Sequence, residues 1–172
     1  MARKEFINIE NTRFIYRTNF SGDPKRDEKY HSTTRKGNII IPTYEQAMDL
    51  LDAGFKVRQT QPKPGEEEGF IPIYFVSICA QYRNSDGTAK STPPKIYIVT
   101  NDEDPYLLEE DMLSIVDDAY VLNVNVMLSG WENPNTGTKS LYIKTMYVEQ
   151  EEDDIYAARY SKSNRESNFD EE

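Results

Sequence analysis

Short apolar runs separated by polar turns recur along the chain. These runs are rich in β-branched and aromatic residues and carry the alternation that predicts strands. Residues 6–9 and 13–17 form either one strand with a break or a short pair of strands. The other predicted strands lie at 38–41, 55–60, 70–83, 94–100, 119–129 and 139–148. Because strands outnumber helices and do not alternate regularly with them, the pattern favours a small Greek-key barrel over a doubly wound parallel sheet.

Two segments show helical spacing instead. Thr43 and Gln46 form a capping box at the start of the first, and Gly54 ends it. The second runs over residues 107–116. The apolar positions that share a helix face are Tyr44, Ala47, Met48 and Leu51 in the first and Leu108, Met112 and Ile115 in the second. The prediction is a mainly β fold with two short inserted helices.

Polar segments divide these elements. Residues 18–37 contain almost no aliphatic side chain, so we expect an exposed loop that buries no core face, and loops of this length are uncommon without a function. Residues 61–69 and 84–92 also read as exposed loops. We predict one domain over residues 1–148 and an acidic, largely flexible C-terminal segment over 149–172.

Charge is distributed unevenly. The net charge is −10, yet residues 1–100 hold 15 Lys and Arg against 12 Asp and Glu, whereas residues 101–172 hold 5 against 18. A basic body with an acidic end fits a protein that binds and releases DNA. A solvated acidic surface that aids solubility is the alternative. The single cysteine, Cys79, lies in an apolar run and is expected to be buried and inert, and without a membrane span or signal segment we expect a cytoplasmic protein.

The sequence contains few signs of a catalytic site. The single histidine, His31, has no partners that form a recognisable triad, and no phosphate-binding glycine motif occurs. Carboxylates crowd residues 102–118, where a metal-dependent nuclease is one interpretation and a solvated helix face is the favoured one. We therefore predict a protein that is not an enzyme, with no cofactor and no metal site.

Aromatic and basic residues are interleaved at several places. Proteins that bind single strands need cations to follow the backbone and flat rings to stack on bases. The candidate DNA-binding residues from this pattern are Phe14, Tyr16, Arg17, Phe20, Lys25, Arg26, Tyr30, Arg35, Lys36, Tyr82, Arg83, Lys95, Tyr97, Tyr142 and Lys144. Tyrosines also suit any β-sheet, and a Lys beside a Tyr is equally an ordinary solvent face. Trp131, at a strand end, is expected either to pack in the core or to stack on a base.

Four segments, in order, resemble a family of phage single-stranded DNA-binding proteins with an OB-fold. They are 17–22, 93–100, the Trp131-Glu132 turn and 141–148, followed by the acidic stretch 149–154. The resemblance spans residues 5–160 and extends more distantly to the helix-destabilising proteins of podophages. It implies an OB-like barrel that binds single strands with little sequence preference in phage replication, recombination or repair. It adds Trp131 and Tyr147 to the candidates and supports Phe20, Lys95, Tyr97, Tyr142 and Lys144.

The C-terminal segment carries a further expectation. Residues 149–172 hold nine acids against three bases, so this segment can imitate a phosphate backbone and then be offered to phage or host replication and recombination proteins. The candidate partner-binding residues are Phe169, Asp170, Glu171 and Glu172. The alternative is a phage protein-interaction factor that binds a host protein through its acidic surface. The sequence leaves oligomerisation open.

Overall fold

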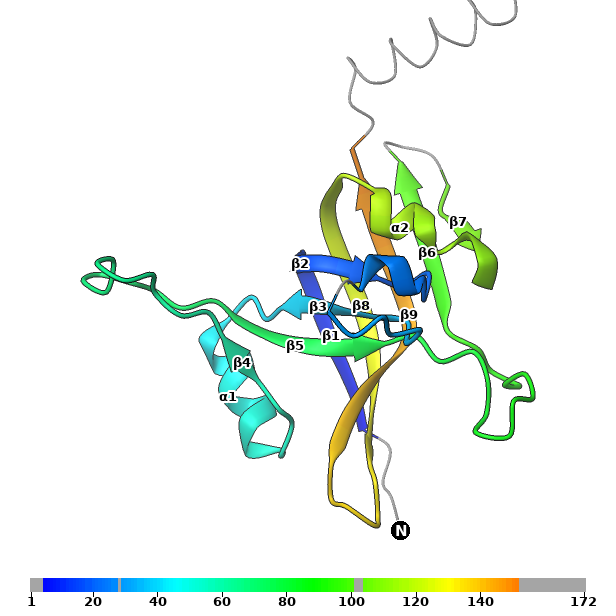
Figure 1. Ribbon diagram of the computed structural model, residues 1–172, viewed down its shortest axis with the longest axis horizontal. Coiled ribbons are helices and arrows are strands. Elements are labelled where there is room, and N and C mark those ends of the chain that lie inside the picture. Colours follow the sequence, from blue (N-terminus) through cyan, green and yellow to red (C-terminus); the bar gives the residue numbers. More distant parts are fainter. Residues whose placement is uncertain (1–4, 28, 101–103, 152–172) are drawn as a thin grey trace, which may run out of the picture.

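One mixed sheet of nine strands carries the fold in the computed structural model, which describes residues 5–27, 29–100 and 104–151 (Figure 1). The strands are β1 (Glu5–Thr12), β2 (Phe14–Asn19), β3 (Lys36–Ile40), β4 (Arg58–Gln59), β5 (Tyr74–Cys79), β6 (Lys95–Thr100), β7 (Tyr106–Leu108), β8 (Val121–Glu132) and β9 (Lys139–Gln150). The helices are α1 (Tyr44–Asp52) and α2 (Ser114–Asp118), with 3-10 turns η1 (Pro24–Arg26) and η2 (Glu110–Met112). The prediction of a mainly β fold with two short helices is confirmed.

The strand order along the sheet is β1-β8-β9-β5-β3-β2. Long β9 pairs antiparallel with β8 and, on its other side, parallel with β5 at Cys79 and Tyr142 and then with β6. The two outermost strands, β1 and β2, follow each other in the chain around a bend where Asn11 has a φ of +54°. No ladder joins them in the described residues, so strand pairing does not close the sheet into a barrel.

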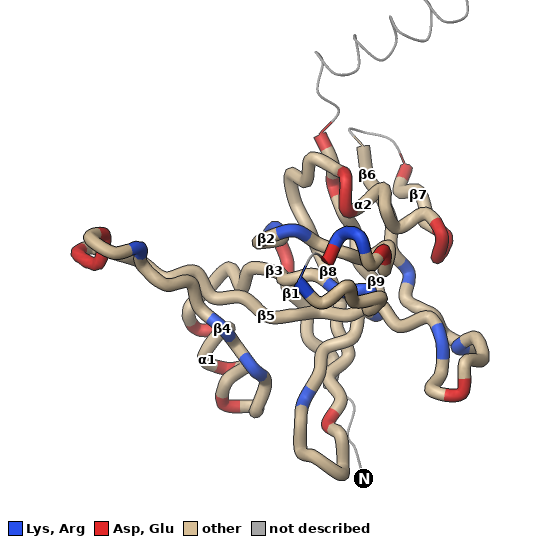
Figure 2. Tube along the Cα trace, in the orientation of Figure 1, with Lys and Arg blue, Asp and Glu red and all other residues tan. Residues whose placement is uncertain are grey.

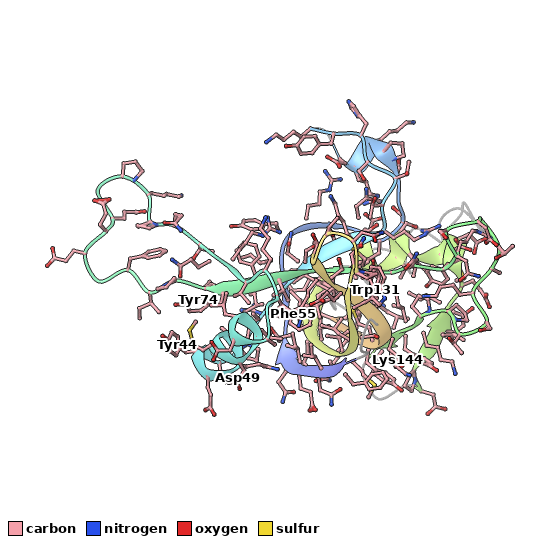
Figure 3. The ribbon with its side chains drawn as sticks, turned by 90° about the horizontal axis from the view of Figure 1, so that it is seen from below. Tyr44, Asp49, Phe55, Tyr74, Trp131 and Lys144 are labelled. Atoms are coloured by element: carbon pink, nitrogen blue, oxygen red, sulfur yellow. The ribbon has the colours of Figure 1, made fainter. Side chains whose placement is uncertain are left out.

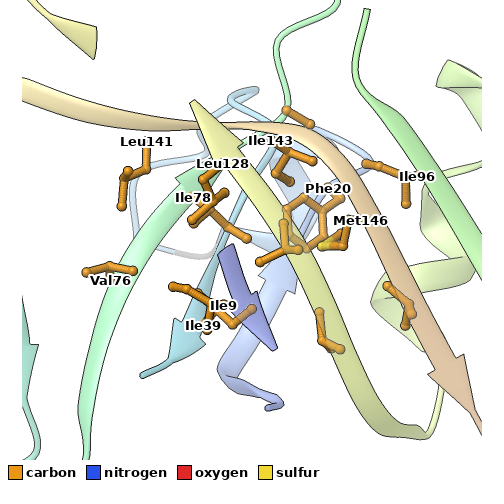
Figure 4. Packing of buried hydrophobic residues seen from close by; sticks show 14 of the residues in the cluster. Ile9, Phe20, Ile39, Val76, Ile78, Ile96, Leu128, Leu141, Ile143 and Met146 are labelled. Atoms are coloured by element: carbon orange, nitrogen blue, oxygen red, sulfur yellow. The ribbon is translucent and has the colours of Figure 1, made fainter. Parts of the chain in front are cut away.

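Alternation along the strands places one face of the sheet in the core. Ile9, Ile39, Ile78 and Ile96 are each completely buried, as the period of two requires. Phe20 is also completely buried, and Figure 4 shows its ring within the same cluster. The expectation that residues 18–37 bury no core face is therefore wrong.

A break in the alternation of β9 decides which side chains share its outer face. Leu128 pairs with Ile143, but Met127 pairs with Thr145, so Lys144 is an additional residue at a β-bulge. The buried positions accordingly change from Leu141 and Ile143 to Met146 and Val148. Tyr142, Lys144 and Tyr147 consequently lie on the outer face together, although a strict alternation would separate them.

Helix α1 confirms its predicted start. The Thr43 hydroxyl accepts a hydrogen bond from the Gln46 amide at 3.1 Å. Gly54 follows the last turn with a φ of +95°, a conformation that favours glycine. The predicted apolar face is confirmed in part: Ala47 is buried and Met48 packs against the core, but Leu50 is buried in place of Leu51, and Tyr44 is exposed.

Three other predicted elements differ from the structure. The helix predicted over 107–116 is divided into β7, η2 and α2, because residues 106–108 pair with β6. Within the strand predicted over 70–83, residues 74–79 alone form β5. Residues 60–73 instead form a projecting arm (Figure 1) that leaves Ile71 84 % exposed. The domain boundary predicted after residue 148 precedes the end of β9 by two residues.

Candidate nucleic-acid interface

The outer face of β1, β8 and β9 carries a groove with a cavity volume of about 380 Å³, which we call the aromatic groove. Its floor and walls are formed by Phe6, Gln81, Asn84, Ser85, Lys90, Thr92, Ser129, Trp131, Tyr142, Ile143 and Lys144. Three rings, Phe6, Trp131 and Tyr142, come from three different strands. Register explains their proximity, because Phe6 and Tyr142 both lie opposite Ser129 of β8.

Cations accompany these rings. Lys144 Nζ lies 4.6 Å from the centroid of the Phe6 ring, and Lys90 reaches the groove from the 84–92 loop. None of the described residues that line the groove is an Asp or a Glu. Figure 3 labels Trp131 and Lys144 on this part of the sheet. The groove thus combines exposed rings with uncompensated positive charge, which is the combination that an unpaired nucleic acid strand requires.

A second aromatic unit adjoins the groove across β9. Tyr97 of β6 lies opposite Tyr147, and their rings stack with centroids 4.8 Å apart and planes 9° from parallel. Lys95, exposed on the same face of β6, lies opposite Thr145. The structure therefore brings six predicted residues to one outer face. They are Lys95, Tyr97, Trp131, Tyr142, Lys144 and Tyr147.

Three of the predicted basic residues, Arg26, Arg35 and Arg83, lie elsewhere. Arg26 forms a bidentate ion pair with Asp118, its Nη1 and Nη2 lying 2.8 and 3.1 Å from the two carboxylate oxygens. Arg35 and Arg83 both pair with Glu110, at 3.4 and 3.3 Å. Figure 2 shows these acids gathered around α2 and β7. These three cations therefore pair with carboxylates of their own chain, and Arg35 and Arg83 share the single charge of Glu110, so their contact with DNA stays a prediction.

Arg35 is bound further by neutral groups. Its Nη1 donates to the carbonyl oxygens of Phe20 and Ser21, at 2.9 and 2.7 Å, and its guanidinium carbon lies 5.7 Å from the Tyr82 ring centroid. Tyr82, in turn, is half-buried, and the desolvation of its phenol raises its pKa to about 12. Arg35 and Tyr82 therefore stabilise the chain after β2 rather than present a binding surface.

The Asp117 carboxylate also binds the end of β2 and the residues that follow it. Its side chain is completely buried, and Oδ1 accepts hydrogen bonds from the Thr18 hydroxyl at 2.7 Å and the Phe20 amide at 2.8 Å. Oδ2 accepts a bond from the Ser21 amide at 3.0 Å. The expectation of a solvated carboxylate face, and equally that of a metal ligand, is wrong for Asp117, because its oxygens are engaged by the chain itself.

The remaining candidates of the first third are scattered. Phe14, Tyr16 and Arg17 line a cavity of about 630 Å³ between β2 and the start of β8, together with Asp117. Tyr16 packs edge-on against Phe75 with centroids 5.4 Å apart. Lys25 and Tyr30 are exposed, Lys36 is half-buried on β3, and Phe20, being in the core, offers no face to a base. The predicted tail residues Phe169–Glu172 lie outside the described residues.

Two further pKa values reflect local surroundings. Burial raises the pKa of the Cys79 thiol, although Cys79 is half-buried rather than enclosed as predicted. The hydrogen bond from Arg26 lowers the pKa of Asp118. Among the described residues, we find no helix long and apolar enough to cross a membrane and no group of three or more His, Cys, Asp or Glu side chains placed to hold a metal ion.

Comparison with known proteins decides the family. The sequence model of a family described as "Putative phage ssDNA-binding domain" matches residues 1–168. The chain belongs to this phage family. No curated protein and no solved structure gives a significant match.

Membership of a phage single-stranded DNA-binding family identifies single-stranded DNA as the partner and indicates a binding protein. Sequence reasoning missed two residues that line the aromatic groove, Phe6 and Lys90. The signal for Phe6 was present, since it alternates with Ile7 and Ile9, which face the core. Lys90 had no comparable signal, because a loop has no fixed period.

Proposed function

We propose that this chain is a sequence-independent single-stranded DNA-binding protein that protects strands in phage replication, recombination or repair. The observation that carries this proposal is the aromatic groove, in which Phe6, Trp131 and Tyr142 lie beside Lys90 and Lys144. Rings of this kind accept any base, because every base has a π-face, and each stacked base contributes about 1–3 kcal/mol. Cations at the same site bind the phosphates without reading sequence.

An OB-like architecture is part of this proposal. The bent segment β1–β2 pairs with β8 through β1 and with β3 through β2, so one continuous segment serves both ends of the sheet. A main-chain hydrogen bond from Ile40 to the Arg13 carbonyl, at 3.0 Å, continues the pairing into the bend. Small barrels built on a curved first strand are a frequent scaffold for single-strand binding. The binding domain of this proposal is the predicted 1–148, extended to the end of β9 at residue 150, and the rest of the acidic segment 149–172 is assigned to contacts with replication or recombination proteins.

The single tryptophan of the chain, Trp131, provides the test because it lies in the groove and is 36 % exposed. Titration with oligo-dT of ~16 nucleotides, within the range of site sizes known for OB domains, should quench its fluorescence to saturation. Binding should weaken at high salt, since log affinity falls linearly with log salt concentration. A duplex of the same length is the control and should bind less tightly.

Single substitutions test whether DNA binds in the aromatic groove. Tyr142→Ala and Lys144→Ala should each raise Kd for oligo-dT, the first by about 5- to 150-fold if it removes the stacking of one base. Tyr44→Ala removes an exposed ring from α1, outside the groove, and should leave Kd unchanged. A folded protein that shows no saturable quenching at low salt would contradict the proposal and favour a factor that binds a host protein.

A further inference from the structure

A second groove, lined by cations, adjoins the aromatic groove on the same outer face of the sheet. We call it the basic groove, and its cavity volume is about 280 Å³. It is lined by Phe55, Lys56, Arg58, Val76, Ser77, Cys79, Lys139, Ser140 and Leu141. None of the described residues in this lining is an Asp or a Glu. The basic groove therefore attracts anions, with serine hydroxyls available as hydrogen-bond donors.

Register joins the two grooves. Tyr142 of the aromatic groove lies opposite Cys79 of the basic groove, and Trp131 of the aromatic groove lies opposite Ser140 of the basic groove. Their β9 linings are also consecutive, residues 139–141 in one and 142–144 in the other. At ~3.3 Å per residue, these six positions span roughly 17 Å. A strand leaving the rings in this direction enters the basic groove directly.

The cations of the basic groove have defined positions. Arg58 Nη2 donates to Asn38 Oδ1 at 2.9 Å, and its guanidinium carbon lies 5.2 Å from the Phe75 ring centroid. Lys139 Nζ donates to the Ala53 carbonyl oxygen, which ties the end of α1 to β9. The partners of Arg58, an amide oxygen and a ring, carry no net charge. Arg58 thus differs from Arg26, whose charge a carboxylate neutralises.

The chemistry of the basic groove selects phosphate rather than base. Its one ring, Phe55, is only 4 % exposed and offers no stacking face. Lys56 and Arg58 are both exposed, and arginine suits bidentate contact with phosphate oxygens.

We propose that the basic groove is a phosphate-binding extension of the DNA site. A strand whose bases stack in the aromatic groove continues across the start of β9, and its sugar–phosphate backbone binds Lys56 and Arg58 with Ser77 and Ser140. This inference rests on the proposed function and adds the path that the bound strand follows across the sheet. The aromatic groove holds bases, and the basic groove holds phosphates with no base contact.

The salt dependence of the double variant Lys56→Ala/Arg58→Ala tests the inference. Removal of each cation that binds a phosphate should reduce the slope of log affinity against log salt by about 0.7, so the slope for oligo-dT of ~16 nucleotides should fall by about 1.4. That change corresponds to roughly 25-fold weaker binding at 0.1 M salt, relative to a 1 M reference. An oligonucleotide of ~4 nucleotides, short enough to be held by the aromatic groove, should bind the variant as tightly as the parent.

Lys63→Ala is the matched control, because it removes an exposed cation from the arm. It should leave the slope unchanged for both lengths. An unchanged slope in the double variant, with Trp131 still quenched, would overturn the phosphate extension and leave the proposed function intact. If neither oligonucleotide quenched the Trp131 fluorescence of the parent protein, the proposed function itself would be refuted.

Cys79 provides a test that needs no variant. It is the single thiol of the chain and lies in the basic groove, so bound DNA should cover it. The longer oligo-dT should slow alkylation of Cys79 at least fivefold, and the short one should leave the rate unchanged. Inorganic phosphate, added at the same concentration of phosphate groups as the oligonucleotide, is the control for a free anion. It should not protect Cys79 from alkylation. Equal rates with and without the longer strand would overturn the inference.

Discussion

Removal of the Asp117 carboxylate should destabilise the protein more than removal of any other single acid among the described residues. Asp117→Ala leaves the Thr18 hydroxyl and the amides of Phe20 and Ser21 without their acceptor. Because the side chain is completely buried, water does not replace it without rearrangement. At about 1–3 kcal/mol for each of these three unsatisfied donors, we expect a loss of at least about 3 kcal/mol in the free energy of unfolding. Such a loss is a large share of the stability of a small domain.

Urea unfolding followed by far-UV circular dichroism measures this loss. Asp117→Asn keeps one acceptor oxygen and should lose about 1–3 kcal/mol, because its amide nitrogen cannot accept from Ser21. Asp111→Ala removes an exposed carboxylate from η2 and should change stability by no more than about 0.5 kcal/mol. A free energy for Asp117→Ala within about 0.5 kcal/mol of the parent would refute the reasoning. Because Asp117 lines neither the aromatic nor the basic groove, the folded variant should bind oligo-dT normally.

Three further variants test individual features of the chain. Gly37→Ala should cost about 1–3 kcal/mol in urea unfolding, because a Cβ would lie 2.8 Å from the Phe20 ring. Tyr82→Phe should not destabilise the protein at pH 7, since the buried hydroxyl has no hydrogen-bond partner in the described residues. The same variant should lose stability less steeply between pH 10 and about pH 12, because burial raises the pKa of Tyr82 to about 12 and the unfolded chain releases that proton first. Removal of residues 161–172 should raise affinity for oligo-dT in a binding titration if the acidic segment competes with DNA, and unchanged affinity would contradict that role.

Local patterns were sufficient for part of the fold. The capping box at Thr43 specified the start of α1, because the hydroxyl and amide that make the cap are three residues apart. The apolar patterns at 94–100 and 119–129 predicted strands where β6 and β8 form, since such a pattern is contained in the strand itself. The segment 106–108 was misassigned because leucine spacing over so few residues fits a helix and a strand equally.

Long-range contacts determine where the predicted site residues lie. Arg26 reads as a free cation in its own segment, but its partner Asp118 is 92 positions away. The partner of Arg35, Glu110, is 75 positions away, and the buried carboxylate that draws Phe20 into the core is 97 positions from it. The bulge at Lys144 is likewise set by pairing with β8 and has no mark in the local sequence. Interleaved rings and cations therefore indicated the class of ligand, whereas the partner of each cation depends on contacts that the local sequence does not show.

These ion pairs also resolve the apparent conflict between a net charge of −10 and a polyanionic ligand. The acids of η2 and α2 face Arg26, Arg35 and Arg83, so much of their charge is compensated at short range. The two grooves lie on the outer face of the sheet, and no described carboxylate lines either of them. Screening limits the reach of distant acids to about 8 Å at physiological salt. The field that a strand meets in the grooves is therefore set by the nearby lysines and Arg58 rather than by the net charge of the chain.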